Sequence, residues 1–138
     1  MPLVSVTRLR LRSVWYLPGF FYYAIRSATE AKHARGNRHV STARTNGLVF
    51  WTVTLWESPE AMRAFRNAGA HVRAMPKLAA WCDEATYVHW EQEHNEPPQW
   101  NEMYERITRE GIVSRVKSPS PNHSQRAFPK PKGLQNES

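Results

Sequence analysis

Apolar and polar residues alternate along residues 3–13 (LVSVTRLRLRS), a run rich in valine, leucine and threonine. Side chains of a strand point alternately to its two faces, so this alternation predicts a β-strand. Pro18 then opens a segment with helical periodicity, which Gly36 ends. Arg26 and Glu30, four residues apart, are expected to pair on the side of this helix. Its apolar face is predicted to carry Phe21, Ala24, Ile25, Ala28 and Ala31.

Two further alternating runs, Arg38–Thr45 and Leu48–Trp56, are joined by Asn46 and Gly47. A two-residue type I′ turn needs positive φ at both central positions, and Asn-Gly is the pair that supplies it most readily. The sequence therefore predicts a β-hairpin here.

A second helix is predicted to begin at Ser58, because a serine N-cap followed by Pro59 at the first helical position is typical of a helix start. Its apolar stripe consists of Met62, Phe65, Ala68, Val72 and Met75. Gly69 and Pro76 are expected to break this helix into two pieces. Alternation returns at Ala85–Glu91, which predicts a fourth strand. A short C-terminal helix follows, with one face formed by Trp100, Met103, Tyr104 and Ile107.

The predicted order is β-α-β-β-α-β with an appended helix, which is the ferredoxin-like α+β arrangement of an antiparallel sheet with helices on one face. The third strand is apolar on one face and carries Phe50, Thr52, Thr54 and Trp56 on the other. Both faces therefore look buried, and the chain offers too few helices to cover both. We expect a partner sheet to cover the second face, and so a homodimer.

The net charge of +7 is concentrated near the C-terminus. From residue 112 onward five basic residues face one acidic residue, a net of +4, in a segment rich in proline and serine. Such a segment buries too little surface to offset its ordering entropy. We expect a dimeric α+β barrel domain over residues 1–111 and a basic tail over residues 112–138, with the residues from about 115 onward disordered or merely lying on the surface of the domain. Because the remaining charge is small, we do not expect nucleic acid as a partner.

No apolar run approaches the length of about 18 residues that a membrane span needs. Arg8, Arg10 and Arg12 interrupt the segment where a leader peptide would have its apolar region. Cys82 is the single cysteine, so no intramolecular disulfide can form. These features predict a cytoplasmic protein. The sequence also lacks a glycine-rich phosphate loop, a Cys/His zinc pattern and a nucleophile elbow, which disfavours nucleotide-driven and hydrolytic enzymes.

Several short motifs resemble a known superfamily. They are the run FWTVTLW at residues 50–56 with Glu57 and Ser58, AMRAF at residues 61–65, Gly69-Ala70-His71, and Ala74-Met75. Together they resemble the dimeric α+β barrel superfamily, and in particular a bacterial family of unknown function that is described as monooxygenase-like. That family is related to spheroidene monooxygenase and to the antibiotic-biosynthesis monooxygenases. A Pro-x-Trp segment after the last strand, Pro98 to Trp100, matches it as well.

The resemblance implies a homodimer with a cavity between sheet and helices in each subunit. It further implies a monooxygenase-like oxidoreductase that acts on a hydrophobic aromatic or polyene molecule, without a cofactor or with haem. The alternative is a non-catalytic module that binds a small ligand, haem included. Fold alone does not decide between these functions.

His71 is the first candidate for chemistry, because it follows Gly69 where the helical stripe is interrupted. A neutral imidazole there can act as a general base on a phenol or hydroquinone, or ligate haem iron. The alternative is structural: His71 bonds a backbone carbonyl and fixes the helix break.

The aromatic residues of the third strand are candidates for a ligand pocket, because such pockets are mostly apolar with few polar groups. The predicted lining residues are Phe50, Trp51, Thr52, Thr54, Trp56 and Trp81, with Trp90 a further candidate. A core or a dimer interface is the alternative for each aromatic residue.

Arg26 and Asp83 are single charges beside apolar stretches, which can orient a substrate or pair with His71, or else form surface ion pairs. His33 and His39 flank a turn and lack a third ligand for zinc. The alternating arginines of the first strand are expected to blunt an exposed edge or to line the rim of a pocket.

Overall fold

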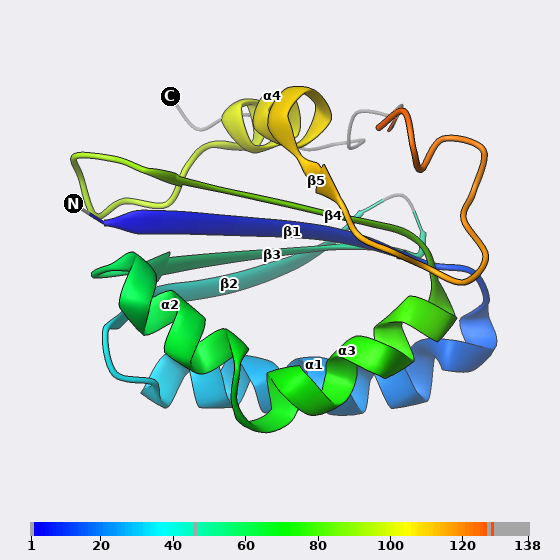
Figure 1. Cartoon of the computed structure of the whole chain (residues 1–138), viewed down its shortest axis with the longest axis horizontal. Coiled ribbons are helices and arrows are strands. Elements are labelled where there is room, and N and C mark those ends of the chain that lie inside the picture. Colours follow the sequence, from blue (N-terminus) through cyan, green and yellow to red (C-terminus); the bar gives the residue numbers. More distant parts are fainter. Residues whose placement is uncertain (1, 46, 127, 129–138) are drawn as a thin grey trace.

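The computed structural model describes residues 2–45, 47–126 and 128 (Figure 1). Its elements in chain order are β1 (Leu3–Leu11), the 3-10 turn η1 (Val14–Tyr16), α1 (Leu17–His33), β2 (Asn37–Thr45), β3 (Val49–Trp56), α2 (Pro59–Arg66), α3 (Gly69–Trp81), β4 (Cys82–Glu91), α4 (Trp100–Glu110) and β5 (Ile112–Val113). The strands form one sheet in the order β2-β3-β1-β4-β5, with every neighbouring pair antiparallel. The predicted α+β ferredoxin-like fold with a C-terminal helix is confirmed.

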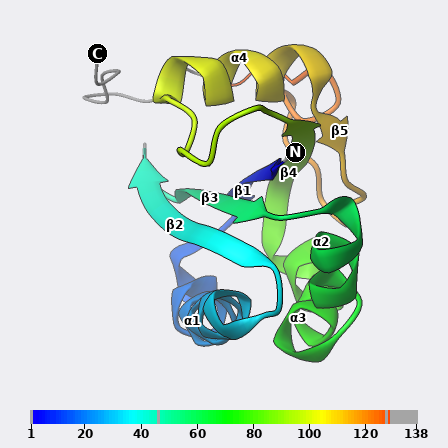
Figure 2. The ribbon, with the colours of Figure 1, turned by 90° about the vertical axis from the view of Figure 1, so that its left-hand side faces the viewer.

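The sheet separates two unequal layers (Figure 2). Helices α1, α2 and α3 lie on one side, and α4 lies on the other. We call the side with Phe50, Thr52, Thr54 and Trp56 of β3 the helix face, and the side with Val49, Trp51, Val53 and Leu55 the α4 face. Within the described residues, no helix combines the length and the apolarity that a membrane crossing would require.

Several local predictions are confirmed. β2 and β3 form the expected hairpin, with Gly47 at φ +82°, whereas Asn46 lies outside the described residues. The Ser58 hydroxyl accepts a hydrogen bond from Ala61 N at 3.2 Å and so caps α2, with Pro59 in the first turn.

The predicted break at Pro76 is wrong, because α3 continues through this residue to Trp81. Proline removes the donor that would bond the carbonyl of Val72, one turn earlier. Both Pro76 and Val72 lie on the exposed side of α3, where water can bond that carbonyl. The helix does restart at Gly69, as predicted.

The two faces of the sheet are packed differently. On the α4 face one continuous apolar cluster joins strands, α4 and Phe128; its members are Val4, Val6, Val49, Trp51, Val53, Leu55, Val88, Met103, Ile107 and Phe128. On the helix face the core is split into two clusters. One is centred on Trp56, Leu3, Ala31 and Met62, and the other on Leu11, Phe20, Phe50 and Cys82.

The segment from residue 112 to Phe128, which we call the strap, packs against the domain. Residues 112–126 and Phe128 are therefore ordered, and the prediction of disorder is wrong for the described part of the tail. Residues 129–138 lie outside the described residues. Backbone bonds tie the strap down from Ser114 N to Ala85 O at 2.8 Å and from Lys117 N to Ala79 O at 2.9 Å. The strap also buries His123 and Phe128. The amino-acid composition of this segment does not reveal these contacts, because they are made by main-chain groups and by two isolated side chains.

A buried ion pair lies beneath the strap. Arg8 Nη1 is 2.6 Å from Glu84 Oε1, and the side chains are only 1% and 3% exposed. Ser120 of the strap donates to Glu84 Oε2 at 2.7 Å, and the Phe128 ring centre lies 4.0 Å from the Arg8 guanidinium carbon. Burial alone would raise the pKa of Glu84, but the hydrogen bonds from Arg8 and Ser120 outweigh it and hold the pKa below its ordinary value. Both partners are therefore charged at neutral pH.

Two sequence-based arguments change with this arrangement. Arg8, Arg10 and Arg12 do not blunt an edge, because β1 lies at the centre of the sheet. The reason given for a partner sheet is also wrong, because α4 and the strap of the same chain cover the second face.

The ion pair gives a test of the fold. Replacing Glu84 by Gln leaves the Arg8 charge buried without a counter-charge, which typically costs about 3–5 kcal/mol. We expect Glu84→Gln to lower the free energy of unfolding in urea by about that amount. Arg10→Gln is the matched control, since the Arg10 side chain is 46% exposed and its pairs contribute about 0–1 kcal/mol. Equal losses in the two variants would contradict the role given to the buried pair.

Candidate functional site

A patch of polar residues crosses the middle of the helix face. The register places Thr54, Ser5 and His89 side by side on β3, β1 and β4, and it places Thr52, Thr7 and Tyr87 side by side in the next row. We call these six residues the polar belt. It lies between the Trp56 cluster and the Phe50 cluster, and so divides the core of the helix face in two.

All six belt residues are only partly buried, although they lie on three adjacent strands beneath a helical layer. The helical layer contributes small side chains here: the residues that α3 buries are Ala70 and Ala74. Methyl groups do not reach far enough to seal the sheet, so the belt keeps contact with solvent. Partly wet hydroxyl groups and a histidine beneath helices are a suitable surface for a small ligand.

His71, the third residue of α3, is held by the end of α2. Its Nδ1 lies 3.2 Å from the carbonyl oxygen of Arg66. A carbonyl can only accept, so Nδ1 carries the proton and donates it. In the neutral ring Nε2 then keeps a free lone pair, which is the form that a general base requires. His71 therefore lies at the helix break, and the contact with a backbone carbonyl that its structural alternative requires is present.

The pKa of His71 is lowered, first by burial and further by the positive charge of Arg66, against a raising effect of the bond to the carbonyl. The pKa of His89 in the belt is lowered by burial and by the same Arg66 charge. Arg66 is therefore close to both histidines. Arg66 is a half-buried residue, and its guanidinium makes no hydrogen bond or ion pair within the described part of the chain. One free cation and two neutral imidazoles suit a ligand that carries or develops negative charge.

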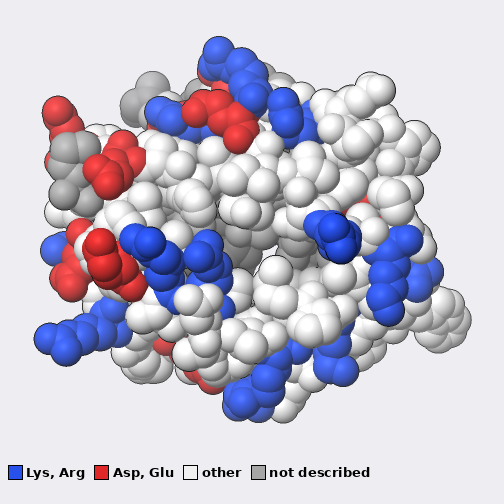
Figure 3. All heavy atoms as spheres, in the orientation of Figure 1, with Lys and Arg blue, Asp and Glu red and all other residues white. Residues whose placement is uncertain are grey.

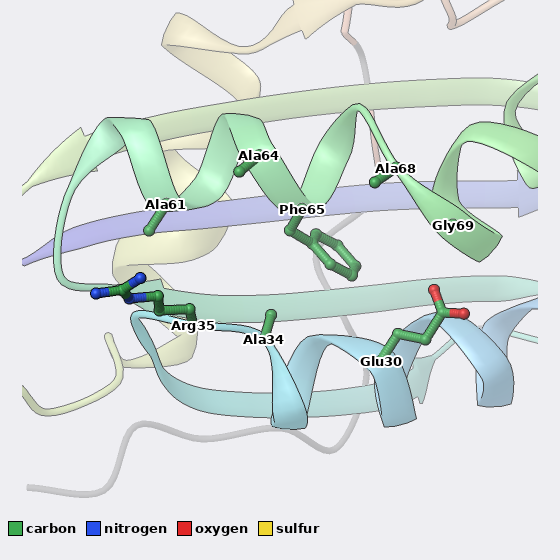
Figure 4. Close-up of a pocket in the computed structure, with 8 residues that line it drawn as sticks. All are labelled: Glu30, Ala34, Arg35, Ala61, Ala64, Phe65, Ala68 and Gly69. Carbon is green, nitrogen blue, oxygen red and sulfur yellow. The ribbon is translucent and has the colours of Figure 1, made fainter.

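An aromatic series connects His71 with the core. The ring centre of Phe65 lies 5.5 Å from that of His71 and 5.3 Å from that of Trp56. Phe65 also lines a groove of about 300 Å³ between α1 and α2 (Figure 4). Four of its eight lining residues are alanines, and Arg35 and Glu30 lie toward its opposite ends. Phe65 is therefore a wall common to the groove and to His71.

Backbone geometry places the histidine. Gly69 has φ +61°, which favours glycine, and a Cβ there would lie 2.5 Å from Glu30 Oε2. The same carboxylate oxygen accepts a hydrogen bond from Ala70 N at 2.8 Å. Since α3 has no side-chain cap of its own, Glu30 of α1 caps it and fixes the helix start two residues before His71. The predicted pair of Arg26 with Glu30 is wrong: Arg26 instead donates to the Tyr22 hydroxyl at 2.9 Å.

The structure separates the predicted lining residues into groups. Thr52, Thr54 and Trp56 share the helix face with His71, and Phe50 lies beyond the belt against Phe20. Trp51 and Trp90 lie on the α4 face, so they cannot line the same cavity. Trp81 packs α3 against η1 and α1: its ring is stacked on that of Tyr16 with centres 5.8 Å apart, and lies 6.2 Å from that of Tyr23. Arg26 is exposed on α1.

The other candidates do not join the site. Asp83 pairs with Arg10 at 3.2 Å and not with His71. His33 is exposed and His39 is half-buried. Among the described residues no three His, Cys, Asp or Glu side chains are grouped so that they could hold a metal ion.

Sequence reasoning missed Arg66 and the role of His89. The position of His89 could have been inferred, because it lies two residues after Tyr87 on the same strand and so points to the same face of the sheet. It lies beside Ser5, which in turn lies beside Thr54. Arg66 had none, since its position depends on how α2 ends and α3 begins.

The comparisons with known proteins agree with this fold. The family model described as a domain of unknown function, DUF3291, matches residues 15–129. No curated protein shows a significant match.

Solved structures match at low identity. Rv0793 from Mycobacterium tuberculosis aligns with a TM-score of 0.62 and 10% identity, covering 68% of this chain and 97% of its own. SnoaB, a cofactor-independent oxygenase from Streptomyces nogalater, aligns with a TM-score of 0.57 and 13% identity, covering 67% and 94%. A protein from Nitrosomonas europaea assigned to the antibiotic biosynthesis monooxygenases aligns with a TM-score of 0.61 and 10% identity, covering 67% and 91%. These likenesses show that the chain has the ferredoxin-type fold of these proteins.

The grouping of Arg66 with two histidines can be tested by NMR titration of the imidazole rings. Removing the positive charge in Arg66→Gln favours the protonated rings, so the pKa values of both His71 and His89 are expected to rise. Arg63→Gln, one turn earlier on α2 and exposed, is the matched control and is expected to leave both unchanged. A rise for one histidine alone would show that Arg66 does not face both.

The placement of α3 gives a second test. Gly47 and Gly69 both have positive φ, where an alanine costs about 1–2 kcal/mol. A Cβ at Gly47 meets nothing within 4 Å, whereas one at Gly69 meets the Glu30 carboxylate. We expect Gly69→Ala to lower the unfolding free energy more than Gly47→Ala and to shift the His71 ring resonances. Equal losses and unshifted resonances would show that the cap does not position His71.

Proposed function

Because the chain belongs to the DUF3291 family, whose function is unknown, we propose a function from the site itself: a monooxygenase-like oxidoreductase that acts on a hydrophobic, weakly acidic aromatic or polyene molecule. The observation that carries the proposal is His71, whose neutral ring keeps Nε2 free and lies near Arg66, on the same side of the sheet as the polar belt.

His71 supplies the proton acceptor. Its lowered pKa keeps the ring neutral at pH 7, so Nε2 can take a proton from an acidic C–H or O–H group. Arg66 stabilises the resulting anion by its charge. The hydroxyl groups of Thr52, Thr54 and Ser5 orient the oxygen atoms of the ligand. His71 is the catalytic base in this proposal, and the belt residues bind substrate.

The redox step needs no further reductant. A deprotonated, electron-rich substrate can itself transfer electrons to dioxygen. One oxygen atom enters the substrate and converts CH₂ to C=O, and the other leaves as water with the two hydrogens of that carbon. The cofactor-independent oxygenase SnoaB shares this fold, which supports a cofactor-free route at the level of fold only.

Haem fits the described residues poorly. His71 Nε2 is free, as a haem ligand requires. The groove at Phe65, however, has a volume of about 300 Å³, the lower end of the range for small-molecule sites, and His71 is not among the residues that line it. We therefore assign no step to haem. The alternative function, a non-catalytic module for small ligands, rests on the same belt and groove.

The homodimer stays a prediction, and α4 with the strap of the same chain, rather than a partner sheet, packs on the α4 face. Light scattering of the purified protein measures it directly.

The proposal is tested by oxygen uptake with 1,8-dihydroxyanthrone as probe, an aromatic compound with an acidic CH₂ group. We expect turnover, and His71→Ala is expected to lower kcat/KM by about 10²–10⁴-fold, the usual contribution of a general base. The wild-type rate should fall only on the acid side of the ordinary histidine pKa of about 6.5, because the pKa of His71 is lowered.

His94→Ala, in an exposed loop, is the matched control and should keep the wild-type rate. Probe binding without oxygen uptake would favour the non-catalytic module. Equal rates for wild type and His71→Ala would remove His71 as the base. A haem titration with a Soret shift and a 1:1 endpoint that His71→Ala abolishes would overturn the cofactor-free form.

A further inference from the structure

A second groove lies on the α4 face, across the sheet from the polar belt. It has a volume of about 360 Å³ and is lined chiefly by Ala43, Trp51, Val53, Pro98, Trp100 and Met103. The Trp51 and Trp100 ring planes are nearly perpendicular, with centres 5.6 Å apart. Grooves lined by aromatic side chains are known to bind extended proline-rich segments. The chemistry proposed for His71 makes no use of this groove.

Phe128, the last residue that the structure describes, lies close to this groove. Phe128 belongs to the same apolar cluster as Trp51, Val53 and Met103. Its ring lies over Arg8, which is the direct neighbour of Trp51 across β1 and β3. Its carbonyl accepts a hydrogen bond from the Tyr104 hydroxyl at 2.6 Å.

Trp100 precedes Tyr104 by one helical turn, a rise of about 6 Å. Two extended residues span about that distance. The ten residues that follow Phe128 are therefore long enough to enter and cross the groove.

The sequence after Phe128 suits the groove. It reads PKPKGLQNES, with Pro129 and Pro131 alternating with Lys130 and Lys132. Alternating prolines favour the extended polyproline conformation, which loses little entropy on binding.

The groove is bordered by negative charge. The loop between β4 and α4 carries Glu93 and Glu96 just before Pro97 and Pro98 of the rim, and neither glutamate has an ion pair with a described residue. Figure 3 shows acidic side chains gathered at the end of the molecule where this loop lies. Two lysines spaced along an extended segment complement these carboxylates.

We propose that residues 129–134 of this chain bind the groove on the α4 face as an intramolecular ligand. The prolines pack on Trp100 and Trp51, and Lys130 and Lys132 lie near Glu93 and Glu96. Tethering to Phe128 gives the segment an effective concentration on the order of millimolar, so weak contacts suffice. The α4 face is then closed from β5 to β2 by the chain's own C-terminal part.

The test uses the full chain with a nitroxide spin label on Leu134→Cys. Burial raises the pKa of Cys82 to about 12, so this thiol resists labelling. In ¹⁵N-labelled protein we expect the indole N–H signal of Trp100 and the amide signal of Ala43 to lose most of their intensity, and to regain it when ascorbate reduces the nitroxide. A label on the exposed Met75→Cys, on the other side of the sheet, is the control and should leave both signals intact.

Two further samples decide the occupant. Lys130→Glu with Lys132→Glu should restore more than half of the lost intensity, and raising the salt concentration should act in the same direction, because exposed charge pairs are screened. A mixture of ¹⁵N-labelled protein without nitroxide and unlabelled protein with it should show no loss. Intensity loss in that mixture would assign the groove to the segment of a second copy, and intact signals throughout would leave the groove to another ligand. Either result overturns the proposal.

Discussion

The Arg8–Glu84 pair constrains much of this structure. It puts two charges at the centre of a sheet face, on adjacent strands, at a separation of 2.6 Å. Removing such ions from water costs several kcal/mol each, and only close pairing with further hydrogen bonds offsets that cost. A plain apolar cover could not supply those bonds. The strap supplies a hydroxyl from Ser120 and an aromatic ring from Phe128, and both reach the pair. The buried charges and the ordered strap therefore depend on each other.

The helix face differs from the α4 face because it does not have to be sealed from water. It buries no ion pair at its centre, and its middle rows consist of hydroxyl groups, Tyr87 and His89. Polar groups that stay in contact with water carry little desolvation cost. The helices therefore do not have to seal this face of the sheet completely. The alanines that α3 turns inward leave that contact open. A ligand that supplies its own oxygen atoms can replace this water without leaving unpaired groups behind. The same sheet thus has one face closed by the chain and one face open to chemistry.

Local rules predicted the elements well, because each depends on neighbours in sequence. The hairpin at Gly47 and the cap at Ser58 follow from turn and cap chemistry within a few residues. The alternation of the third strand also places Trp51 and Trp56 on opposite faces of the sheet, although both residues were predicted to line one pocket. Pairing at long range was not readable. Arg8 and Glu84 are 76 residues apart, and Glu30 caps a helix that begins 39 residues later, at Gly69.

The solved structures and the family model match different lengths of this chain. The solved neighbours are covered almost completely by about two thirds of this chain, which is the length of the segment from β1 to β4. That segment builds the helix face with His71 and the belt. The DUF3291 match instead runs to residue 129 and so includes α4 and the strap. The cover of the α4 face therefore belongs to the family's domain. Under the function proposed above, differences in substrate within the family would be sought in the belt and in Arg66, both of which lie on the helix side of the sheet.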